Sequence, residues 1–325
     1  MSRVGGVLGL VLTAALVLSL LLGSVPLPLD RVISALVFEA SEGDRLVVWQ
    51  IRLPRALAAA FVGAALGMSG AALQGLLRNP LAEPGILGVS ATAALFATFV
   101  LYFGLATSGS LVLPLAAVTG ALVATGIVAS AALRTRSVVT LILIGVGLSS
   151  FSGAMMALLM NLAPNPFSLS DMVNWMLGTV DNRSFEDLAF AAPFLVLGCG
   201  IMLATRRGLS ALALGEEAAQ GLGLDLRRQR LGIIVGAGFA TGAAVALAGA
   251  IGFVGIVAPH LVRPFVRYEP GRLLVPSALL GALLLVLADI GVRILPTNSE
   301  LKLGVVASLI GAPIFIWIAS RRRLA

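Results

Sequence analysis

The sequence predicts an all-α polytopic membrane protein, with about ten transmembrane helices in one bundle. Of its 325 residues, 59% are hydrophobic and only 11% are charged, whereas soluble domains are roughly 45–50% apolar and about 25% charged. So few charges cannot coat a soluble protein of this size, and the mean hydropathy of +1.05 agrees. Because no linker or polar domain interrupts the apolar runs, we expect residues 1–325 to form a single transmembrane domain.

Nine apolar runs have the length that a membrane-spanning helix needs, about 20 residues. The first run could be a signal peptide, but the unbroken series after it favours a retained anchor. One run, 231–259, is too long for a single span and contains three late glycines before Pro259. We therefore divide it into 231–248 and 250–262, which makes ten spans. The other eight runs are 4–22, 55–77, 86–106, 111–133, 138–160, 188–205, 273–295 and 303–320.

The arginines predict the orientation, because basic residues concentrate on the cytoplasmic side of a membrane protein. With ten spans both termini are cytoplasmic, and most arginines lie inside. The outer segments are then about 26–54 and 161–187, and the second contains a stretch, 171–177, expected to form a short interfacial helix. The largest inner segment is about 206–230. The arginines left outside are Arg31, Arg45, Arg52, Arg55, Arg183 and Arg293.

Glycine and one acidic residue characterise the spans themselves. The 37 glycines include small-residue spacings such as Gly63-xxx-Gly67, which let helix backbones approach closely in lipid. Asp289 is the clear intramembrane charge and lies four residues before Arg293, on the same helix face. A structural pair near the outer surface is favoured over an ion relay, which would need a chain of ionisable partners.

Several function classes are excluded by composition. One cysteine, Cys199, and one histidine, His260, leave no basis for a disulfide framework or a Cys/His metal cluster. Lys302 is the sole lysine and does not lie in a glycine-rich phosphate-binding loop of the Walker A type. We therefore expect no enzymatic activity in this chain, and any ATP hydrolysis must come from another polypeptide. The net charge of +7 is interpreted as membrane topology, not nucleic-acid binding.

The inner segment from Leu212 to Asp225 predicts a short helix, because Ala, Glu and Gln favour helix and glycines stand on either side. Its Glu-Ala-Ala…Gly pattern resembles the coupling segment of ATP-binding-cassette (ABC) permeases. Further motifs extend the resemblance along the chain. They are Arg52-Leu53-Pro54-Arg55, Arg78-Asn79-Pro80-Leu81-Ala82, Pro84-Gly85-Ile86-Leu87-Gly88, Gly252-Phe253-Val254-Gly255, Pro259-His260 and Gly311-Ala312-Pro313.

Together, and in this order over about residues 30–320, these motifs resemble the FecCD-type permeases, which import iron-siderophore chelates, haem and vitamin B12. The resemblance implies a permease homodimer of ten helices per copy in the bacterial cytoplasmic (inner) membrane. It also implies two ATPase subunits, which hold ATP and Mg²⁺, and a solute-binding protein that docks outside. No cofactor is expected in this chain.

The resemblance also implies roles for particular residues. Arginines at the outer face would meet acidic residues of the binding protein; without the resemblance, interfacial snorkelling would explain them. The inner gate is expected at the start of the fifth span, where two valines stand in place of the small hydroxyl residues of a relative. The residues are Leu214, Gly215, Glu216, Glu217, Ala218, Ala219 and Gly223 for ATPase coupling, Arg52, Arg55 and Arg293 for docking, and Ser137, Val138, Val139 and Thr140 for the gate.

The fifth span and the helix after it line the dimer axis in relatives, so they supply candidate pathway residues. Methionines at helical spacing also suit simple packing, and both interpretations stay open. Lys302 stands where the family usually has proline; it would attract an anionic chelate or pair with Glu300 or Asp171. The candidates are Met155, Met156, Met160, Asn161, Asn165 and Lys302.

The predicted function is therefore the permease subunit of a binding-protein-dependent ABC importer, working by alternating access. The alternative is a secondary transporter driven by an ion gradient, which would need ionisable or coordinating groups at the midplane. A third class, an intramembrane enzyme, would need a nucleophile with a base or a metal cluster. The sequence does not distinguish iron-siderophore, haem and vitamin B12 as substrates.

Overall fold

The computed structural model describes residues 3–23, 26–106, 111–135, 137–295 and 301–321, and within these ranges it is helical with no β-strand. Ten helices correspond to the ten expected spans. Seven of them are long and apolar enough to cross a membrane, and α5, α13 and α15 are shorter apolar helices. The ten are α1 (Arg3–Leu21), α4 (Leu53–Leu77), α5 (Val89–Tyr102), α6 (Val112–Arg134), α7 (Val138–Asn161), α9 (Phe185–Ala204), α12 (Leu226–Ala248), α13 (Val254–Val262), α14 (Pro270–Ile294) and α15 (Leu303–Arg321).

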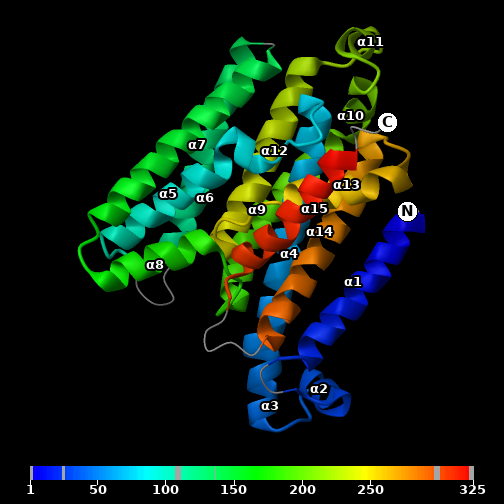
Figure 1. The fold of residues 1–325 in the computed structure, drawn as a ribbon. Helices are drawn as coiled ribbons and strands as arrows, with labels where there is room; N and C mark the ends of the chain where they lie inside the picture. Colours follow the sequence, from blue (N-terminus) through cyan, green and yellow to red (C-terminus); the bar gives the residue numbers. More distant parts are fainter. Residues whose placement is uncertain (1–2, 24–25, 107–110, 136, 296–300, 322–325) are drawn as a thin grey trace.

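Shorter helices lie between the spans. At one end of the bundle are α2 (Leu29–Leu36) and α3 (Glu42–Leu46), and α3 continues through a π-helical turn into α4; we call this the α2 end. At the opposite end, the α11 end, are α10 (Arg206–Leu212) and α11 (Glu216–Gly221) (Figure 1). The start of α1 and the end of α15 point toward the α11 end. The predicted short helix in the 161–187 segment is α8 (Pro166–Leu177).

The centre of the bundle is formed by α4 and α12. In an apolar 18-residue stretch of each span, the share that is buried inside the chain is 83% for α4 and 78% for α12, compared with 17% for α7 and 22% for α1. α14 packs along α4, while α6 and α9 pack along α12. A helix buried this far inside the chain moves with its neighbours, whereas α7 presents most of its surface to lipid or to another protein.

Glycine sets the spacing between α4 and α14, as the Gly-xxx-Gly pattern predicts. A Cβ atom on Gly63 would lie 2.2 Å from the carbonyl oxygen of Gly281, and one on Gly67 would lie 2.2 Å from that of Ser277. Four residues along α4 are matched by four residues back along α14, so the two antiparallel helices keep one register. The backbones touch because no side chain separates them.

The division of the run 231–259 is confirmed. α12 ends at Ala248, and Gly249 (φ +70°) turns the chain away from the helix before α13 begins at Val254. Phe253 at the start of α13 also has a positive φ, +66°. A Cβ on Gly249 would collide with the Trp175 carbonyl at 2.3 Å. Glycine is therefore required at this turn for both its conformation and its lack of volume.

Candidate functional site

A short helix projects from the α11 end of the bundle (Figure 1). α11 covers Glu216–Gly221 and lies between two glycines with positive φ, Gly215 at +110° and Gly223 at +84°. Other residues reach such backbone conformations only with strain between Cβ and the backbone. The prediction of a short helix with glycines on either side is confirmed, and the glycines determine where α11 begins and ends.

The preceding helix, α10, is attached to several spans at once. Its attachments are side-chain hydrogen bonds that connect it, or its N-cap Thr205, to the end of α4, the start of α14 and the first turns of α12. The bonds are Arg78 Nη2 to Leu212 O (3.1 Å), Ser210 Oγ to Glu269 Oε1 (3.0 Å), and Gln229 Nε2 to Thr205 O (2.8 Å). α10 is therefore a fixed base from which α11 projects.

α11 itself is attached by one apolar and one charged contact. Ala219 is fully buried, and Nη2 of Arg230 on α12 donates to both carboxylate oxygens of Glu216, at 2.8 and 2.9 Å. The Arg230 side chain is 5% exposed and that of Glu216 is 37% exposed. Glu216, which the sequence assigned to ATPase coupling, thus faces the bundle with its carboxylate.

The other coupling candidates face away from the bundle. Leu214 and Leu222, on either side of α11, are 68% and 69% exposed, and Glu217 and Ala218 are exposed between them. These leucines lie beyond the end of the spans and are accessible to another protein. α11 therefore has an anchoring side, Glu216 and Ala219, and a presenting side, Leu214, Glu217 and Leu222.

The predicted gate residues lie at the start of α7. Ser137 is the N-cap of this helix, and its hydroxyl accepts a hydrogen bond from the backbone N–H of Thr140 at 3.2 Å. Val139 points outward and is 64% exposed. The Ser137 hydroxyl is therefore accounted for as a helix cap, and a gating role for the segment stays a prediction.

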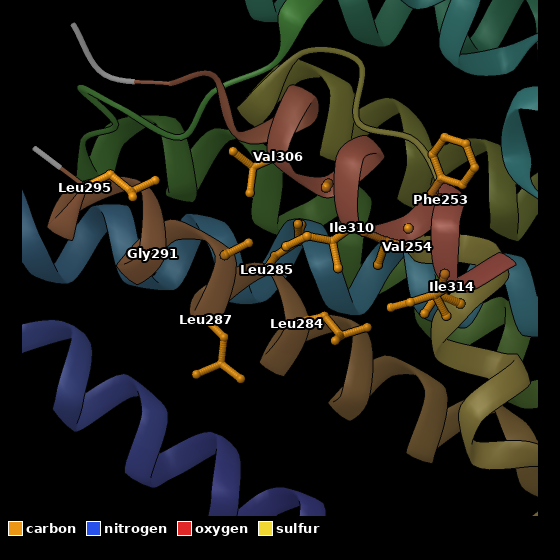
Figure 2. Close-up of a pocket in the computed structure, with 14 residues that line it drawn as sticks. Phe253, Val254, Leu284, Leu285, Leu287, Gly291, Leu295, Val306, Ile310 and Ile314 are labelled. Carbon is orange, nitrogen blue, oxygen red and sulfur yellow. The ribbon is translucent and has the colours of Figure 1, made fainter. Parts of the chain in front are cut away.

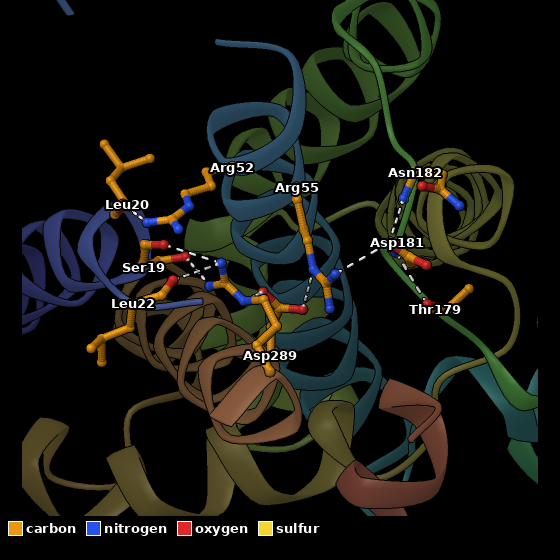
Figure 3. A network of polar contacts seen from close by, with 10 residues as sticks. Ser19, Leu20, Leu22, Arg52, Arg55, Thr179, Asp181, Asn182 and Asp289 are labelled. Atoms are coloured by element: carbon orange, nitrogen blue, oxygen red, sulfur yellow. Dashed lines mark hydrogen bonds and ion pairs between the residues drawn. The ribbon is translucent and has the colours of Figure 1, made fainter. Parts of the chain in front are cut away.

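At the α2 end, a buried carboxylate lies between two of the predicted docking arginines (Figure 3). Asp289 on α14 accepts a 2.8 Å hydrogen bond from Nε of Arg55 on α4, and its second oxygen lies 3.1 Å from Nε of Arg293. The three side chains are 2%, 7% and 6% exposed. The expected Asp289–Arg293 pair is present, with Arg55 as a third member that spacing along the chain did not predict.

The remaining donors of this cluster bind the end of α1 (Figure 3). Nη1 of Arg52 donates to the carbonyls of Leu20 (2.6 Å) and Leu21 (3.0 Å), and Nη1 of Arg293 donates to those of Ser19 (3.1 Å) and Leu22 (3.2 Å). The last carbonyls of a helix have no partner inside the helix. The three arginines are thus turned into the chain and join α1, α4 and α14; their docking role stays a prediction.

One carboxylate of the cluster reaches the surface. Asp181 lies 3.2 Å from Nη1 of Arg55 and its side chain is 36% exposed. It belongs to the loop between α8 and α9. That loop also bonds the end of α12 and the start of α15, through Thr179 N to Ala248 O (2.8 Å) and Gly304 N to Gly178 O (3.2 Å). Arg55 therefore joins α4 and α14 to a loop that also contacts α12 and α15.

The candidate pathway residues do not share one environment. Met156 is 7% exposed and packs with Ala94 and Leu95 of α5, so it packs inside the chain. Asn165 caps α8 by accepting from Ser168 N at 2.9 Å. Asn161 is exposed, whereas Met155, Met160 and Lys302 are half-buried. Glu300, the proposed partner of Lys302, lies outside the described residues.

Three polar residues inside the bundle escaped the sequence reasoning. Glu83, just before the Pro84 turn, accepts a 3.3 Å hydrogen bond from the backbone N–H of Phe253 at the start of α13. Arg263 after α13 bonds Gln74 of α4. Arg230 was counted only as an inner arginine. For Glu83 and Arg263 the available signal was their position beside helix breaks, where free backbone groups need polar partners; no local signal pointed to Arg230.

An apolar cavity of about 420 Å³ lies between α13, α14 and α15 (Figure 2). Leu284, Leu287, Ile310 and Phe253 are among the residues that line it. It offers almost no polar group to a hydrophilic solute. In the described part of the chain no three His, Cys, Asp or Glu side chains are grouped as metal ligands.

Comparison with known proteins agrees with this architecture. The sequence profile of the FecCD transport family matches residues 11–321. A solved ABC transporter in an inward-facing conformation, described as being of the metal-chelate type, superposes with a TM-score of 0.87 at 31% identity. The superposition covers 99% of this chain and 100% of that one.

Two curated relatives align over nearly the whole chain. The uncharacterized ABC transporter permease protein YvrB of Bacillus subtilis is 37% identical over 324 residues, covering 96% of this chain and 91% of YvrB. The vitamin B12 import system permease protein BtuC of Klebsiella pneumoniae is 38% identical over 317 residues, covering 97% of this chain and 93% of BtuC.

Proposed function

The chain belongs to the FecCD transport family, and from this premise we propose that it is the permease that carries an iron chelate, either siderophore or haem, or vitamin B12 into the cytoplasm. An ABC importer permease of this type supplies the membrane-spanning route and leaves ATP hydrolysis to partner subunits. The named relatives include a vitamin B12 permease and a metal-chelate-type transporter, which supports this range of substrates.

The proposed assembly contains two copies of this chain, two ATPase subunits that bind ATP and Mg²⁺, and a solute-binding protein. It lies in the bacterial inner membrane with the α11 end in the cytoplasm. Members of an ABC importer permease family require ATPase and binding-protein partners in general; the homodimer and the stoichiometry are our proposal. The largely unburied α7 supports a partner beside that helix.

The observation that carries the coupling proposal is α11. It is a short helix on a fixed base, and it presents Leu214, Glu217 and Leu222 beyond the end of the bundle. We propose that this presenting side enters a cleft of the ATPase. ATP binding then shifts the permease between its two conformations only if the closed ATPase binds one of them more tightly.

A secondary transporter driven by an ion gradient is not favoured. It needs ionisable or coordinating groups exposed to a pathway at the midplane. In the described spans, Asp289 is held between Arg55 and Arg293 near the α2 end, where it joins helices. The family of the chain also points to ATP-driven import.

The decisive experiment reconstitutes the permease with its ATPase and binding protein and measures ATP-dependent uptake. Glu217→Arg should abolish uptake while permease assembly and thermal stability stay at wild-type levels, because Glu217 is exposed and makes no structural contact that would be lost. The matched control is Glu186→Arg, an exposed glutamate on α9. Normal uptake by the Glu217 variant would contradict the coupling proposal.

Substrate and docking are tested separately with the purified binding protein. Titration with ferric siderophore, haem and vitamin B12 identifies the ligand. Affinity of the binding protein for the permease in nanodiscs should fall for Arg52→Glu if Arg52 docks. Unchanged affinity, in a variant whose melting temperature is also unchanged, would remove Arg52 from the docking surface.

A further inference from the structure

We infer that Arg230 is the positioning residue that makes α11 move together with α12. This inference deepens the proposed function and rests on it, since α11 is there the contact with the ATPase. It concerns a residue inside the permease, which the motif at 214–223 does not contain. Arg230 would act through Glu216 and would not touch the ATPase.

α11 is too short to fix its own direction. It has six residues, and isolated helices shorter than about 12–15 residues are marginal in water. Its direction therefore depends on tertiary contacts. α10 has hydrogen bonds to the ends of α4 and α14 and, through its N-cap Thr205, to α12, whereas α11 is held at its buried side by Ala219 and by the Glu216–Arg230 ion pair.

The Glu216–Arg230 ion pair has a defined geometry and a buried arginine. One nitrogen, Nη2 of Arg230, donates to both oxygens of Glu216 at 2.8 and 2.9 Å, which fixes the carboxylate in position as well as in distance. The Arg230 side chain is 5% exposed. A guanidinium buried to this extent needs its counter-charge, so it holds Glu216 against α12.

α12 connects this ion pair to the centre of the bundle. This helix is 78% buried and packs along α4, α6 and α9 in the centre of the bundle. Its first turn is fixed by Asp225, whose Oδ1 accepts from the backbone N–H of Arg227 and Arg228. Arg230 therefore transmits a displacement of α11 directly to a central helix of the bundle, in addition to the path through the α10 base.

The chain offers matched controls for both partners. Arg228 lies two residues from Arg230 on α12, and its side chain is 89% exposed. Glu217 follows Glu216 and is exposed. Arg230→Met and Glu216→Gln remove the ion pair, whereas Arg228→Met, and in the label measurement alone Glu217→Gln, change the same kinds of side chain without touching it. The exchange Glu216→Arg with Arg230→Glu restores a pair of opposite charges.

The first measurement needs only the full-length permease in nanodiscs. A nitroxide label is placed at Leu222→Cys in a Cys199→Ala background, and its mobility is recorded by electron paramagnetic resonance. We expect Arg230→Met and Glu216→Gln to mobilise the label, Arg228→Met to leave it unchanged, and the exchanged pair to restore the restricted spectrum. An unchanged spectrum in Arg230→Met would overturn the inference.

The second measurement uses the complex with its ATPase and binding protein. Uptake per ATP hydrolysed should fall about tenfold in Arg230→Met, the size expected when a coupling contact is lost, and stay at the wild-type value in Arg228→Met. A wild-type ratio of uptake to ATP hydrolysis in Arg230→Met would also overturn the inference that Arg230 couples α11 to α12. If wild type shows no ATP-dependent uptake, the proposed function fails, while the label spectra still test whether Arg230 positions α11.

Discussion

Arg55 and Arg230 lie at opposite ends of the bundle, and both are buried against a carboxylate, yet the two sites differ in how the carboxylate is held. Asp289, the partner of Arg55, is 2% exposed and lies on the long helix α14. Glu216, the partner of Arg230, is 37% exposed and lies on the six-residue helix α11. The first site joins packed spans, whereas the second joins a span to a projection.

This difference indicates that folding stability and motion depend on different ends of the molecule. Removing one partner of a fully buried pair leaves a charge that water cannot reach, so the folded state suffers directly. Where the remaining partner lies at the edge, water can solvate it, so removing the buried arginine costs little stability but releases the element that it held. We therefore expect the α2 end to govern folding and the α11 end to govern coupling.

The largest expected effect is at Asp289. Asp289→Asn keeps the shape of the side chain but leaves Arg55 and Arg293 facing each other without their shared counter-charge. The free energy of unfolding should fall by about 3–5 kcal/mol, measured by thermal or denaturant unfolding in detergent. Asp181→Asn is the control: its side chain is 36% exposed, and its loss should change stability by about 1 kcal/mol or less. Equal effects of the two variants would remove the distinction between buried and edge carboxylates.

A smaller loss is expected at Gly63, which tests whether packing places Arg55 beside Asp289. Residues 55, 63 and 67 of α4 face residues 289, 281 and 277 of α14 in one register. Gly63→Ala puts a methyl group 2.2 Å from the Gly281 carbonyl and should destabilise the protein by about 1–3 kcal/mol, as overpacking does. Gly9→Ala on α1 meets nothing within 4 Å and serves as the control. Wild-type stability of Gly63→Ala would show that the helices can separate without cost.

The smallest stability effect is expected at the α11 end. Arg230→Met should lower the free energy of unfolding by about 1 kcal/mol or less, because the remaining carboxylate of Glu216 is partly exposed to water. The same unfolding measurement as for Asp289→Asn checks it. A loss as large as that of Asp289→Asn would mean that Arg230 is part of the folding core, and the contrast between the two ends would disappear.

The spans and the short helix at 216–221 could be predicted from the sequence, because both depend on neighbours along the chain. Apolar runs of sufficient length have to be helical in lipid, and Gly215 and Gly223 mark the ends of α11 by their own conformational freedom. The split between α12 and α13 followed from the length of the run and from the arginine distribution. The pairing of Asp289 with Arg293 followed from helix geometry at a spacing of four.

Only the tertiary structure decided which arginines face which carboxylates. Arg55 meets Asp289, 234 residues away, because close glycine contacts bring α4 and α14 together in one register. Glu216 meets Arg230 because the chain folds back between α11 and α12, and Glu83 meets Phe253 because two helix breaks coincide in space. Composition and periodicity specify the face that a residue occupies on its own helix. The neighbour opposite depends on packing over the whole bundle, and no local pattern contains it.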